Sequence, residues 1–212
     1  RYYLRYGVDL KEREEFTFSP VNFGVVLHAV IREVCDEIKK NGESYYMISE
    51  EKRREMVERS VTAITDIYQN SILKDSSRNS FMIKRMEDLA DRTIWAMGEQ
   101  LKCGDFVPFV FEHKFNMEVG DGDRKQLMSG TIDRVDICEN DTDVYVRIID
   151  YKTGKKDFDI VKTYYGIDIQ LMVYMEAAMK LVAKMCPGKN VIPAGVFYYN
   201  ISDPIVSATT ES

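Results

Sequence analysis

Three charged side chains in two strand-like runs, between residues 130 and 154, have the residue types and spacing best suited to chemistry. The runs alternate with a period of two, so successive side chains lie on opposite faces of a strand. Asp133 in the first run shares its face with apolar residues, and so do Asp150 and Lys152 in the second. A carboxylate on an apolar face is costly unless something offsets its charge. We therefore expect a metal ion and a phosphate to meet at these strand ends.

The sequence Asp150-Tyr151-Lys152 is a D-x-K triplet, and its two charged side chains project from one face of the strand about 6–7 Å apart. Mg²⁺ prefers oxygen ligands from carboxylates, carbonyl groups and water. Asp133 and Asp150 supply the carboxylates if their strands pair, and the Tyr151 carbonyl is a candidate third oxygen. Beside the metal, Lys152 orients or helps to deprotonate a water, or stabilises the negative charge of a pentavalent phosphorane.

The triplet thus predicts metal-assisted hydrolysis of a phosphodiester, in which the metal polarises a phosphoryl oxygen and generates the nucleophile. The alternative interpretation is an exposed Asp–Lys pair at a strand end, which contributes little energy. Asp133 on the neighbouring run, also on an apolar face, strengthens the first interpretation.

A further candidate ligand is His28, in the middle of the apolar stripe of a helix expected over residues 19–40. Ser19 and Pro20 are a typical N-cap and first helical residue. If the helix packs near the strand ends, His28 is a metal ligand, and a neutral imidazole suits Mn²⁺ better than Mg²⁺. Otherwise it is a hydrogen-bonded core histidine. Gly24, one turn earlier on the same face, permits close approach of backbone or DNA.

Polar residues downstream of the triplet are candidates for substrate binding. Gln170 and Tyr174 are four residues apart on the next expected helix and therefore share a face. We expect them to hydrogen-bond a phosphate or Lys152, or to form the polar edge of the buried stripe. Three lysines that follow the triplet either contact a nucleic-acid backbone or are solvated surface: Lys155, Lys156 and Lys162.

The elements that must position these residues follow from hydrophobic periodicity and from helix and turn signals. Three helices come first, then three strands in an antiparallel meander with turns at residues 120–123 and 139–143, then a helix and a last strand. This order indicates a mixed sheet with helices packed on it, in the α/β or α+β class. The expected helices are 19–40, 49–70, 77–104 and 159–184, and the expected strands are 106–119, 126–138, 143–152 and 191–201.

The composition sets limits on the class of protein. A chain of 212 residues is one large domain, or one domain with a helical appendage. No apolar run is long enough to cross a membrane, and four scattered cysteines favour a reduced, cytoplasmic protein without a zinc site. The net charge of −6 gives no support for nucleic-acid binding, which usually requires an excess of basic residues. It does not exclude a nuclease, because acidic metal ligands make the net charge more negative. Because the chain begins with Arg1, we expect it to be part of a longer polypeptide.

Four short motifs occur along the chain: F-G-x-x-x-H (Phe23 to His28), G-x-I-D-R-x-D (Gly130 to Asp136), I-I-D-Y-K-T-G (Ile148 to Gly154) and Y-G-x-x-x-Q-L-x-x-Y (Tyr165 to Tyr174). Their types and order resemble the RecB-type branch of the PD-(D/E)xK nucleases. The resemblance implies an α/β, restriction-endonuclease-like core, with a mixed central sheet flanked by helices and an N-terminal helical region. It also implies one nuclease domain over residues 1–212, with a mainly helical part (1–104) that carries His28 and a catalytic sheet and helix (105–201).

The same resemblance implies roles for individual residues. The implied metal ligands are His28, Asp133, Asp150 and the carbonyl of Tyr151. The implied catalytic residues are Asp133, Asp150 and Lys152, and the implied substrate-binding residues are Gln170 and Tyr174. Glu112 on the first strand matches an acidic position of the family less securely. Arg134 and Asp136 face the opposite side of their strand, and we expect them to be structural.

The opening residues 1–16 and the sequence around Tyr164 resemble, more narrowly, the nuclease domain of AddB-type helicase–nuclease subunits. This resemblance implies a Mg²⁺- or Mn²⁺-dependent exodeoxyribonuclease that acts on single-stranded DNA beside an AddA-like helicase subunit, in double-strand break resection and recombinational repair. The alternatives are a stand-alone RecB-like exonuclease, or a non-catalytic DNA-binding or scaffolding domain that retains the fold. An intact Asp133, Asp150 and Lys152 argue against a non-catalytic domain.

The cysteines depart from this pattern. The AddB-type family is expected to carry a [4Fe-4S] cluster held by one cysteine before this region and three after it. Cys35, Cys103, Cys138 and Cys186 have neither that placement nor that spacing. We therefore expect the cluster's cysteines to lie outside this sequence.

Overall fold

The architecture is given by a computed structural model, which describes residues 20–69, 77–119 and 125–202. The opening segment 1–16, the expected Ser19 cap and the expected turn at 120–123 lie outside the described residues. The described helices are α2 (Pro20–Lys40), α3 (Glu50–Gln69), α4 (Ser77–Leu101), α5 (Ile160–Tyr164) and α6 (Gln170–Met185). The strands are β1 (Val107–Val119), β2 (Gln126–Glu139), β3 (Asp143–Lys152) and β4 (Asn190–Asn200).

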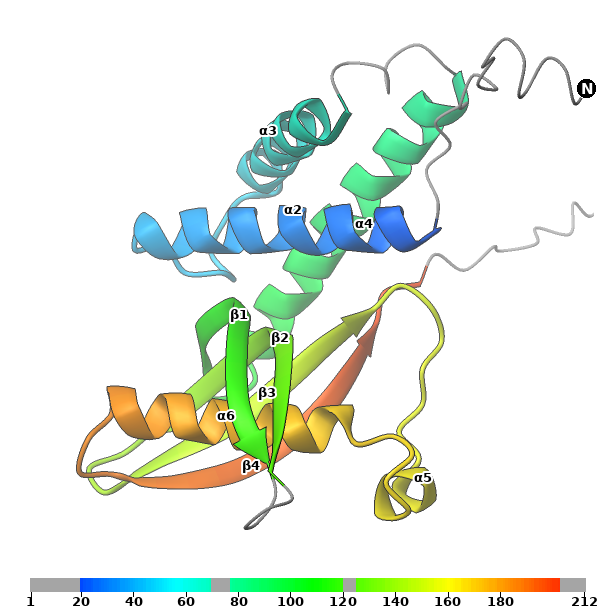
Figure 1. The fold of residues 1–212 in the computed structure, drawn as a ribbon. Helices are drawn as coiled ribbons and strands as arrows, with labels where there is room; N and C mark the ends of the chain where they lie inside the picture. The colour runs from blue at the N-terminus through cyan, green and yellow to red at the C-terminus, as the bar shows by residue number, and fades with distance from the viewer. Residues whose placement is uncertain (1–19, 70–76, 120–124, 203–212) are drawn as a thin grey trace, which may run out of the picture.

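Helices α2, α3 and α4 form a layer on one side of the sheet (Figure 1). Apolar residues of α2 recur every three or four positions, so one stripe of the helix is buried. That stripe, which includes Leu27, Val30 and Val34, packs with apolar residues of α3 and α4 in a first hydrophobic core. Within the described ranges, no helix has the length and apolarity that crossing a membrane requires.

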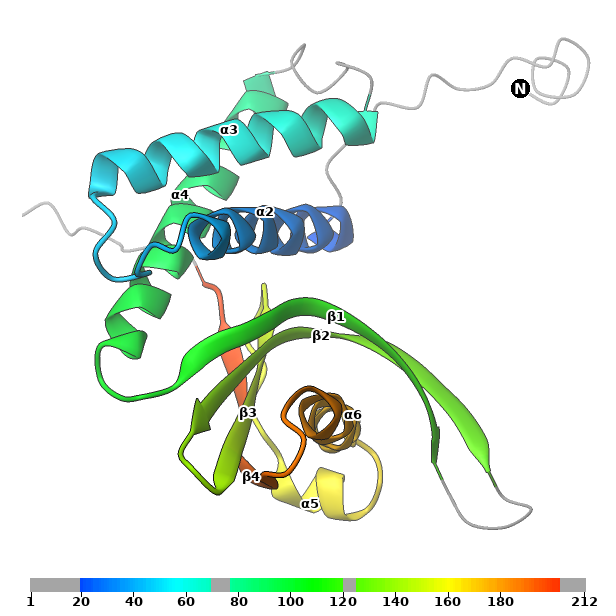
Figure 2. The ribbon, with the colours of Figure 1, turned by 90° about the vertical axis from the view of Figure 1, so that its left-hand side faces the viewer.

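The four strands form one sheet in the order β1-β2-β3-β4. The pairs β1/β2 and β2/β3 are antiparallel, and β3/β4 is parallel. The expected meander and mixed sheet are therefore both confirmed. Figure 2 shows the long β1–β2 ribbon arching over α6, which lies on the face opposite the helical layer.

Alternation along β3 divides its side chains between two hydrophobic cores. Val146 and Ile148 pack with α6 in the second core, whereas Ile149 and Tyr151 pack with the helical layer in the first. Asp150 and Lys152 continue the α6 face, as the period-two pattern predicts. Asp150 and Lys152 thus lie where the apolar face of the sheet that packs on α6 comes to an end.

One helix of the sequence-based prediction is wrong. Residues 159–184 were expected to form a single helix, but the structure has a short α5 and a separate α6. Gly166 has a φ of +73°, a left-handed conformation that ends helices. Its neighbour Ile167 donates its N–H back to the Lys162 carbonyl at 2.8 Å. The chain then crosses an irregular stretch before α6 begins at Gln170.

Candidate metal centre and active site

The centre of the site is the end of the β2/β3 ladder. Arg134 pairs with Ile149 in the register, so the next residues along the two strands are Asp133 and Asp150. Both carboxylates are buried, with relative exposures of 8% and 2%. Oδ2 of Asp133 accepts the backbone N–H of Tyr151 at 2.7 Å. This bond ties the two strand ends together through a side chain.

Three potential metal ligands meet at Asp133, each from a different element. Nδ1 of His28, from α2, lies 3.5 Å from Oδ1 of Asp133 on β2 and 3.6 Å from Oε1 of Glu112 on β1. One donor atom from each of the three residues lies within 4.8 Å of the others. The sequence left His28 as either a core histidine or a ligand. The structure places it at the strand ends, in contact with two carboxylates.

Glu112 was only weakly indicated by the sequence, yet it belongs to this cluster. Its φ is +47°, and among the described residues it is the one non-glycine with a positive φ. Such a conformation is strained, and strained residues are often found at functional sites. The β1/β2 register also shifts between Pro108 and Val110. Strand alternation read from the sequence therefore does not hold across this part of β1.

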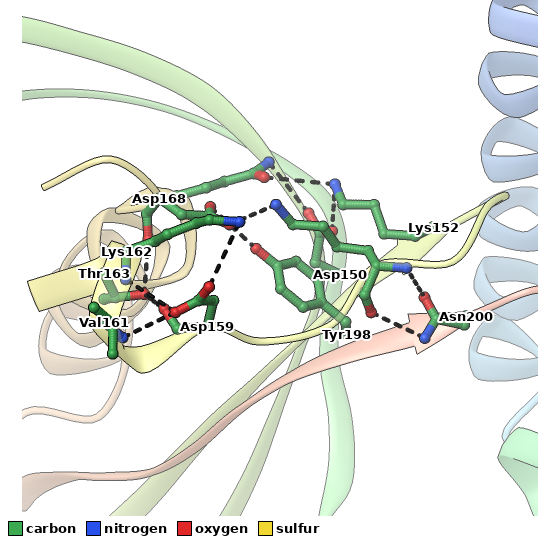
Figure 3. A network of polar contacts seen from close by, with 11 residues as sticks. Asp150, Lys152, Asp159, Val161, Lys162, Thr163, Asp168, Tyr198 and Asn200 are labelled. Carbon is green, nitrogen blue, oxygen red and sulfur yellow. Dashed lines mark hydrogen bonds and ion pairs between the residues drawn. The ribbon is translucent and has the colours of Figure 1, made fainter. Parts of the chain in front are cut away.

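The second half of the site is the D-x-K pair with its helix. Nζ of Lys152 lies 2.5 Å from Oδ2 of Asp150 and 3.5 Å from Oε1 of Gln170. Gln170 in turn donates from Nε2 to Oδ1 of Asp150 at 3.3 Å and to the Tyr174 hydroxyl at 2.9 Å. Figure 3 shows Lys152 beside Asp150 at the end of β3. The structure thus brings together all four of these sequence-predicted residues.

Asp150 stands slightly apart from the cluster of His28, Glu112 and Asp133. Burial raises the pKa of Asp150, and the ammonium of Lys152 partly offsets this. Oδ2 of Asp150 is buried and accepts no well-directed hydrogen bond, although Nζ of Lys152 lies close to it. It is therefore an oxygen with spare capacity to accept a ligand.

The charge on His28 depends on the same carboxylates. Burial alone would lower its pKa, but hydrogen bonds and charge interactions with Asp133 and Glu112 raise it to about 9. Without a metal, the imidazolium therefore provides part of the positive charge that these two carboxylates require. A metal ion would take over that role and needs the neutral imidazole.

These residues fit a divalent cation. The cluster offers one imidazole nitrogen and two carboxylates within 4.8 Å, a donor set that suits Mg²⁺ through oxygen and Mn²⁺ through oxygen and nitrogen. Asp150 adds a third carboxylate on the adjacent strand, with one oxygen lacking a directed hydrogen bond. Three carboxylates face one lysine and one histidine, so the site has an excess of negative charge.

Comparison with known proteins identifies the family to which this site belongs. Residues 1–211 match the model of the PD-(D/E)XK nuclease superfamily. The chain belongs to this superfamily. Its D-x-K triplet, Asp150 to Lys152, provides the last part of the pattern in the family's name.

Curated relatives carry a more specific name, that of the B-type subunit of an ATP-dependent helicase/deoxyribonuclease. The protein of Lachnoclostridium phytofermentans is 36% identical over 209 residues, which is 99% of this chain and 18% of that protein. The protein of Caldanaerobacter subterraneus subsp. tengcongensis is 34% identical over 98% of the chain and 18% of its own length. The expected resemblance to AddB-type proteins is confirmed, and the chain spans less than a fifth of each of these relatives.

The candidate site has two further neighbours that the sequence did not indicate, Tyr198 and Asp168. The ring of Tyr198 on β4 lies 5.7 Å from Nζ of Lys152 and 5.5 Å from Nζ of Lys156. Lys156 also forms an ion pair with Asp168 at 2.5 Å, and Asp168 accepts the Tyr198 hydroxyl at 3.4 Å. Tyr198 lies opposite Asp150 in the parallel β3/β4 register. The position of Tyr198 beside β3 follows only from this long-range pairing of strands.

On the other face of the sheet, Arg134 and Asp136 form a fully buried ion pair. Nε and Nη2 of Arg134 each donate to Asp136 at 2.6 Å, and Nε of Arg147 donates to the same carboxylate at 2.9 Å. Arg134 also lies 3.5 Å from the Tyr151 hydroxyl. These bonds lie between β2, β3 and the helical layer, and the structural role of the pair stays a prediction.

The four cysteines are free thiols in the described structure. Cys35 is buried in the helical layer, and burial raises the pKa of its thiol. Among the described residues, the one group suited to metal binding contains no cysteine. These four cysteines therefore do not fit the ligand set of an iron–sulfur cluster.

Proposed function

We propose that the chain is a Mg²⁺- or Mn²⁺-dependent DNA nuclease domain that hydrolyses phosphodiester bonds. The observation that supports this most strongly is the convergence of two groups at one end of the sheet. One is the cluster of His28, Glu112 and Asp133, and the other is the Asp150–Lys152 pair. Both belong to a chain of the PD-(D/E)XK superfamily. A site that had lost catalysis would not need to retain both.

The metal would be held by His28, Glu112 and Asp133, with Asp150 and the carbonyl of Tyr151 beside them. A divalent cation bound there polarises a phosphoryl oxygen and makes a bound water more acidic. The carboxylates of Glu112 and Asp133 need a positive charge beside them, which a bound cation would supply in place of the imidazolium of His28. Glu112 thus joins the ligand set expected from the sequence.

Lys152 is the proposed catalytic residue of the chain itself. Its ammonium is held by Asp150 and Gln170 at the strand end, where it can orient a water or stabilise charge that develops on the phosphate. Gln170 contacts both members of the D-x-K pair and the Tyr174 hydroxyl. We assign Gln170 and Tyr174 to positioning this pair and to hydrogen bonding with the substrate phosphate.

The relatives' names support a helicase-associated deoxyribonuclease, and the resemblance to AddB-type proteins supports the rest of the biological setting. In this setting the chain is an exodeoxyribonuclease domain within a longer AddB-type polypeptide, which acts on single-stranded DNA beside an AddA-like helicase during double-strand break resection, in the cytoplasm. The helical layer and the sheet would act as a single domain, because His28 comes from one and Asp133 from the other. A stand-alone RecB-like exonuclease is the alternative with the same chemistry.

Lys152→Ala tests the catalytic assignment. Removing the ammonium should reduce cleavage of a labelled single-stranded oligonucleotide by about 10²–10⁴-fold in Mg²⁺ or Mn²⁺. The thermal midpoint should fall little, because Lys152 is partly exposed and because Asp150, whose pKa burial already raises, can take up a proton when the ammonium is lost. Lys102→Ala, on an exposed lysine at the end of α4, is the matched control. Undiminished cleavage by Lys152→Ala would remove Lys152 from the mechanism.

Metal binding is measured separately, so that a weakly active chain still gives an answer. Calorimetric titration with Mn²⁺ should show one strong site in the wild type and none in Asp133→Ala. An unchanged titration in that variant would contradict the proposed metal centre.

A further inference from the structure

The segment that follows the catalytic strand exposes an unusual number of large apolar side chains. Tyr164 is 85% exposed and Tyr165 is 72% exposed, and the five residues of α5 include no buried one. A concentration of exposed apolar side chains on a protein surface usually marks a binding site. We call this surface the α5 platform, and it comprises Phe158, Ile160, Val161, Tyr164, Tyr165 and Ile167, all between 47% and 85% exposed.

The α5 platform is held in place by polar contacts rather than by a core. Asp159 caps α5 by accepting the N–H groups of Val161 and Lys162, each at 3.0 Å. The Thr163 hydroxyl contacts the carbonyls of Asp159 and Asp168 at 2.9 and 3.0 Å (Figure 3). These contacts fix both ends of the short helix, so its apolar side chains are exposed on an ordered support.

The same contacts join the platform to the catalytic centre. Asp168 binds Lys156 and the Tyr198 hydroxyl, and the Tyr198 ring lies 5.7 Å from Nζ of Lys152. Asn200 holds the backbone of Lys156 through two hydrogen bonds of 3.0 Å. In Figure 3 the side chains of Asp168, Tyr198 and Lys152 lie one after another in space, between α5 and the end of β3. The platform and the D-x-K pair are therefore linked through Asp168 and Tyr198.

We propose that the α5 platform binds single-stranded DNA, with bases stacked on Tyr164 and Tyr165 and phosphates against Lys155 and Lys162. This rests on the proposed nuclease function and adds to it a site that guides the strand to the catalytic centre. Aromatic rings bind unpaired bases of any sequence by stacking. The two rings stand nearly perpendicular, at 83° with centroids 5.4 Å apart, and their exposure leaves ring surface accessible to bases.

The lysines beside the platform are each paired with an aspartate in an exposed contact. Lys155 is paired with Asp157 at 3.9 Å, and Lys162 with Asp159 at 3.5 Å. Exposed pairs of this kind are weak, so phosphates can compete for the two lysines. A protein partner could also cover the aliphatic side chains of the platform. The lysines and the proximity to Lys152 favour the nucleic acid.

The test measures binding without cleavage. The whole 212-residue chain is titrated against a fluorescent oligothymidylate in the presence of a chelator, and anisotropy gives the dissociation constant. Tyr164→Ala with Tyr165→Ala should weaken binding by about thirtyfold or more, because two stacking rings are lost. Replacing both by Phe should preserve binding, because the rings remain. Tyr46→Ala with Trp95→Ala, two half-exposed aromatics of the helical region, is the control and should change nothing.

Replacement of both tyrosines by Leu separates stacking from apolar docking. Leu keeps an apolar surface but removes the rings, so binding should fall as in the Ala variant. If the Leu or Ala variants bind the oligonucleotide as tightly as the wild type, or if the wild type does not bind it, the proposal is wrong. The platform would then be better explained as a surface for a protein partner.

The lysines provide an independent measurement. Replacing Lys155 and Lys162 by Ala should reduce the slope of log affinity against log salt by about 1.4, because two phosphate contacts are lost. An unchanged slope would remove both lysines from the site.

Hydrolysis of bis(p-nitrophenyl) phosphate separates this proposal from the nuclease assignment. The compound is a single phosphodiester without a strand that could span the catalytic centre and the platform, so the double Tyr→Ala variant should hydrolyse it as fast as the wild type. If the wild type fails to hydrolyse it in Mg²⁺ and Mn²⁺ while oligonucleotide binding still depends on the tyrosines, the catalytic assignment fails and the platform stands.

Discussion

Two groups of buried charges lie back to back on the same strands, and they are built differently. On the face toward the helical layer, both oxygens of Asp136 are held by arginine nitrogens from Arg134 and Arg147. On the other side, Asp133 and Asp150 end the β2/β3 ladder beside a single lysine. Asp133 and Arg134 are adjacent in the sequence. The alternation of a strand is enough to place them in two different environments.

The first group is complete, whereas the second lacks positive charge. The Arg134–Asp136 pair is fully buried with its charges matched. The carboxylates of Glu112, Asp133 and Asp150 face Lys152 and a histidine that must be protonated to contribute. A buried group whose charges are matched helps to specify a structure. A buried group with excess negative charge is suited to bind a cation. The following predictions test this difference, from the largest effect to the smallest.

Asp150→Asn should affect activity far more than stability. We expect a loss of cleavage on the order of 10³–10⁴-fold, about 4–5 kcal/mol in the barrier, because a metal-facing carboxylate and the partner of Lys152 are removed. Burial raises the pKa of Asp150, so its ionised form destabilises the fold, and this cost is relieved only as the pH falls through the folded pKa. The metal-free variant should melt at the same temperature as the wild type or higher. A large drop in the melting temperature would assign Asp150 to the structural group.

Asp136→Ala should do the reverse. It leaves the buried Arg134 without its carboxylate, which should cost about 3–5 kcal/mol in urea unfolding. Asp141→Ala, on an exposed turn, is the control and should be nearly neutral. Replacing the pair together, by Arg134→Met with Asp136→Leu, should recover most of the loss. If Asp136→Ala unfolds like the wild type, the pair does not stabilise the fold as we describe.

The protonation of His28 should make metal binding depend on pH. In the metal-free protein, the stabilisation by charged His28 is complete below its ordinary pKa of 6.5 and is lost as the pH rises through about 9. Binding of Mn²⁺ must displace this proton. Its affinity should therefore rise about tenfold per unit, about 1.4 kcal/mol, from pH 7 to about 9 and then level off. Calorimetric titration in two buffers that differ in ionisation enthalpy measures how many protons are released on binding. In His28→Gln the affinity for Mn²⁺ should no longer rise with pH.

Arg147→Met should have the smallest effect of the four. Asp136 keeps its two bonds from Arg134, and the replaced side chain is partly exposed where it stacks on Phe106 at 4.4 Å. We expect a loss of about 1 kcal/mol in urea unfolding. A loss as large as that of Asp136→Ala would mean that Arg147, rather than Arg134, neutralises the carboxylate.

The sequence predicted the parts of the site that depend on local alternation. Period two placed Asp133, Asp150 and Lys152 on one side, and helical spacing paired Gln170 with Tyr174. It did not predict that Glu112 joins His28, because a register shift and a positive φ interrupt β1. A local pattern carries no information about such an irregularity.

Two other features depended on information outside the local pattern. The break between α5 and α6 results from the left-handed turn at Gly166, a conformation that spacing of apolar residues does not reveal. The place of Tyr198 depends on which strand pairs with β3, and that is a long-range choice. The mixed sheet and the element order, in contrast, followed from element types and turn signals, and the structure confirms them.

The close contact at Gly24 has a consequence for how the molecule works as a whole. A Cβ at this position would lie 3.3 Å from the Thr153 hydroxyl, so α2 rests against the chain just after the catalytic strand. His28 belongs to the helical layer and Asp133 to the sheet, so an ion held by both would bridge the helical layer and the sheet. Metal affinity and docking of the helical layer are then thermodynamically linked: each favours the other by the same free energy. Any partner that shifts α2 would thus change the occupancy of the site without touching a catalytic residue.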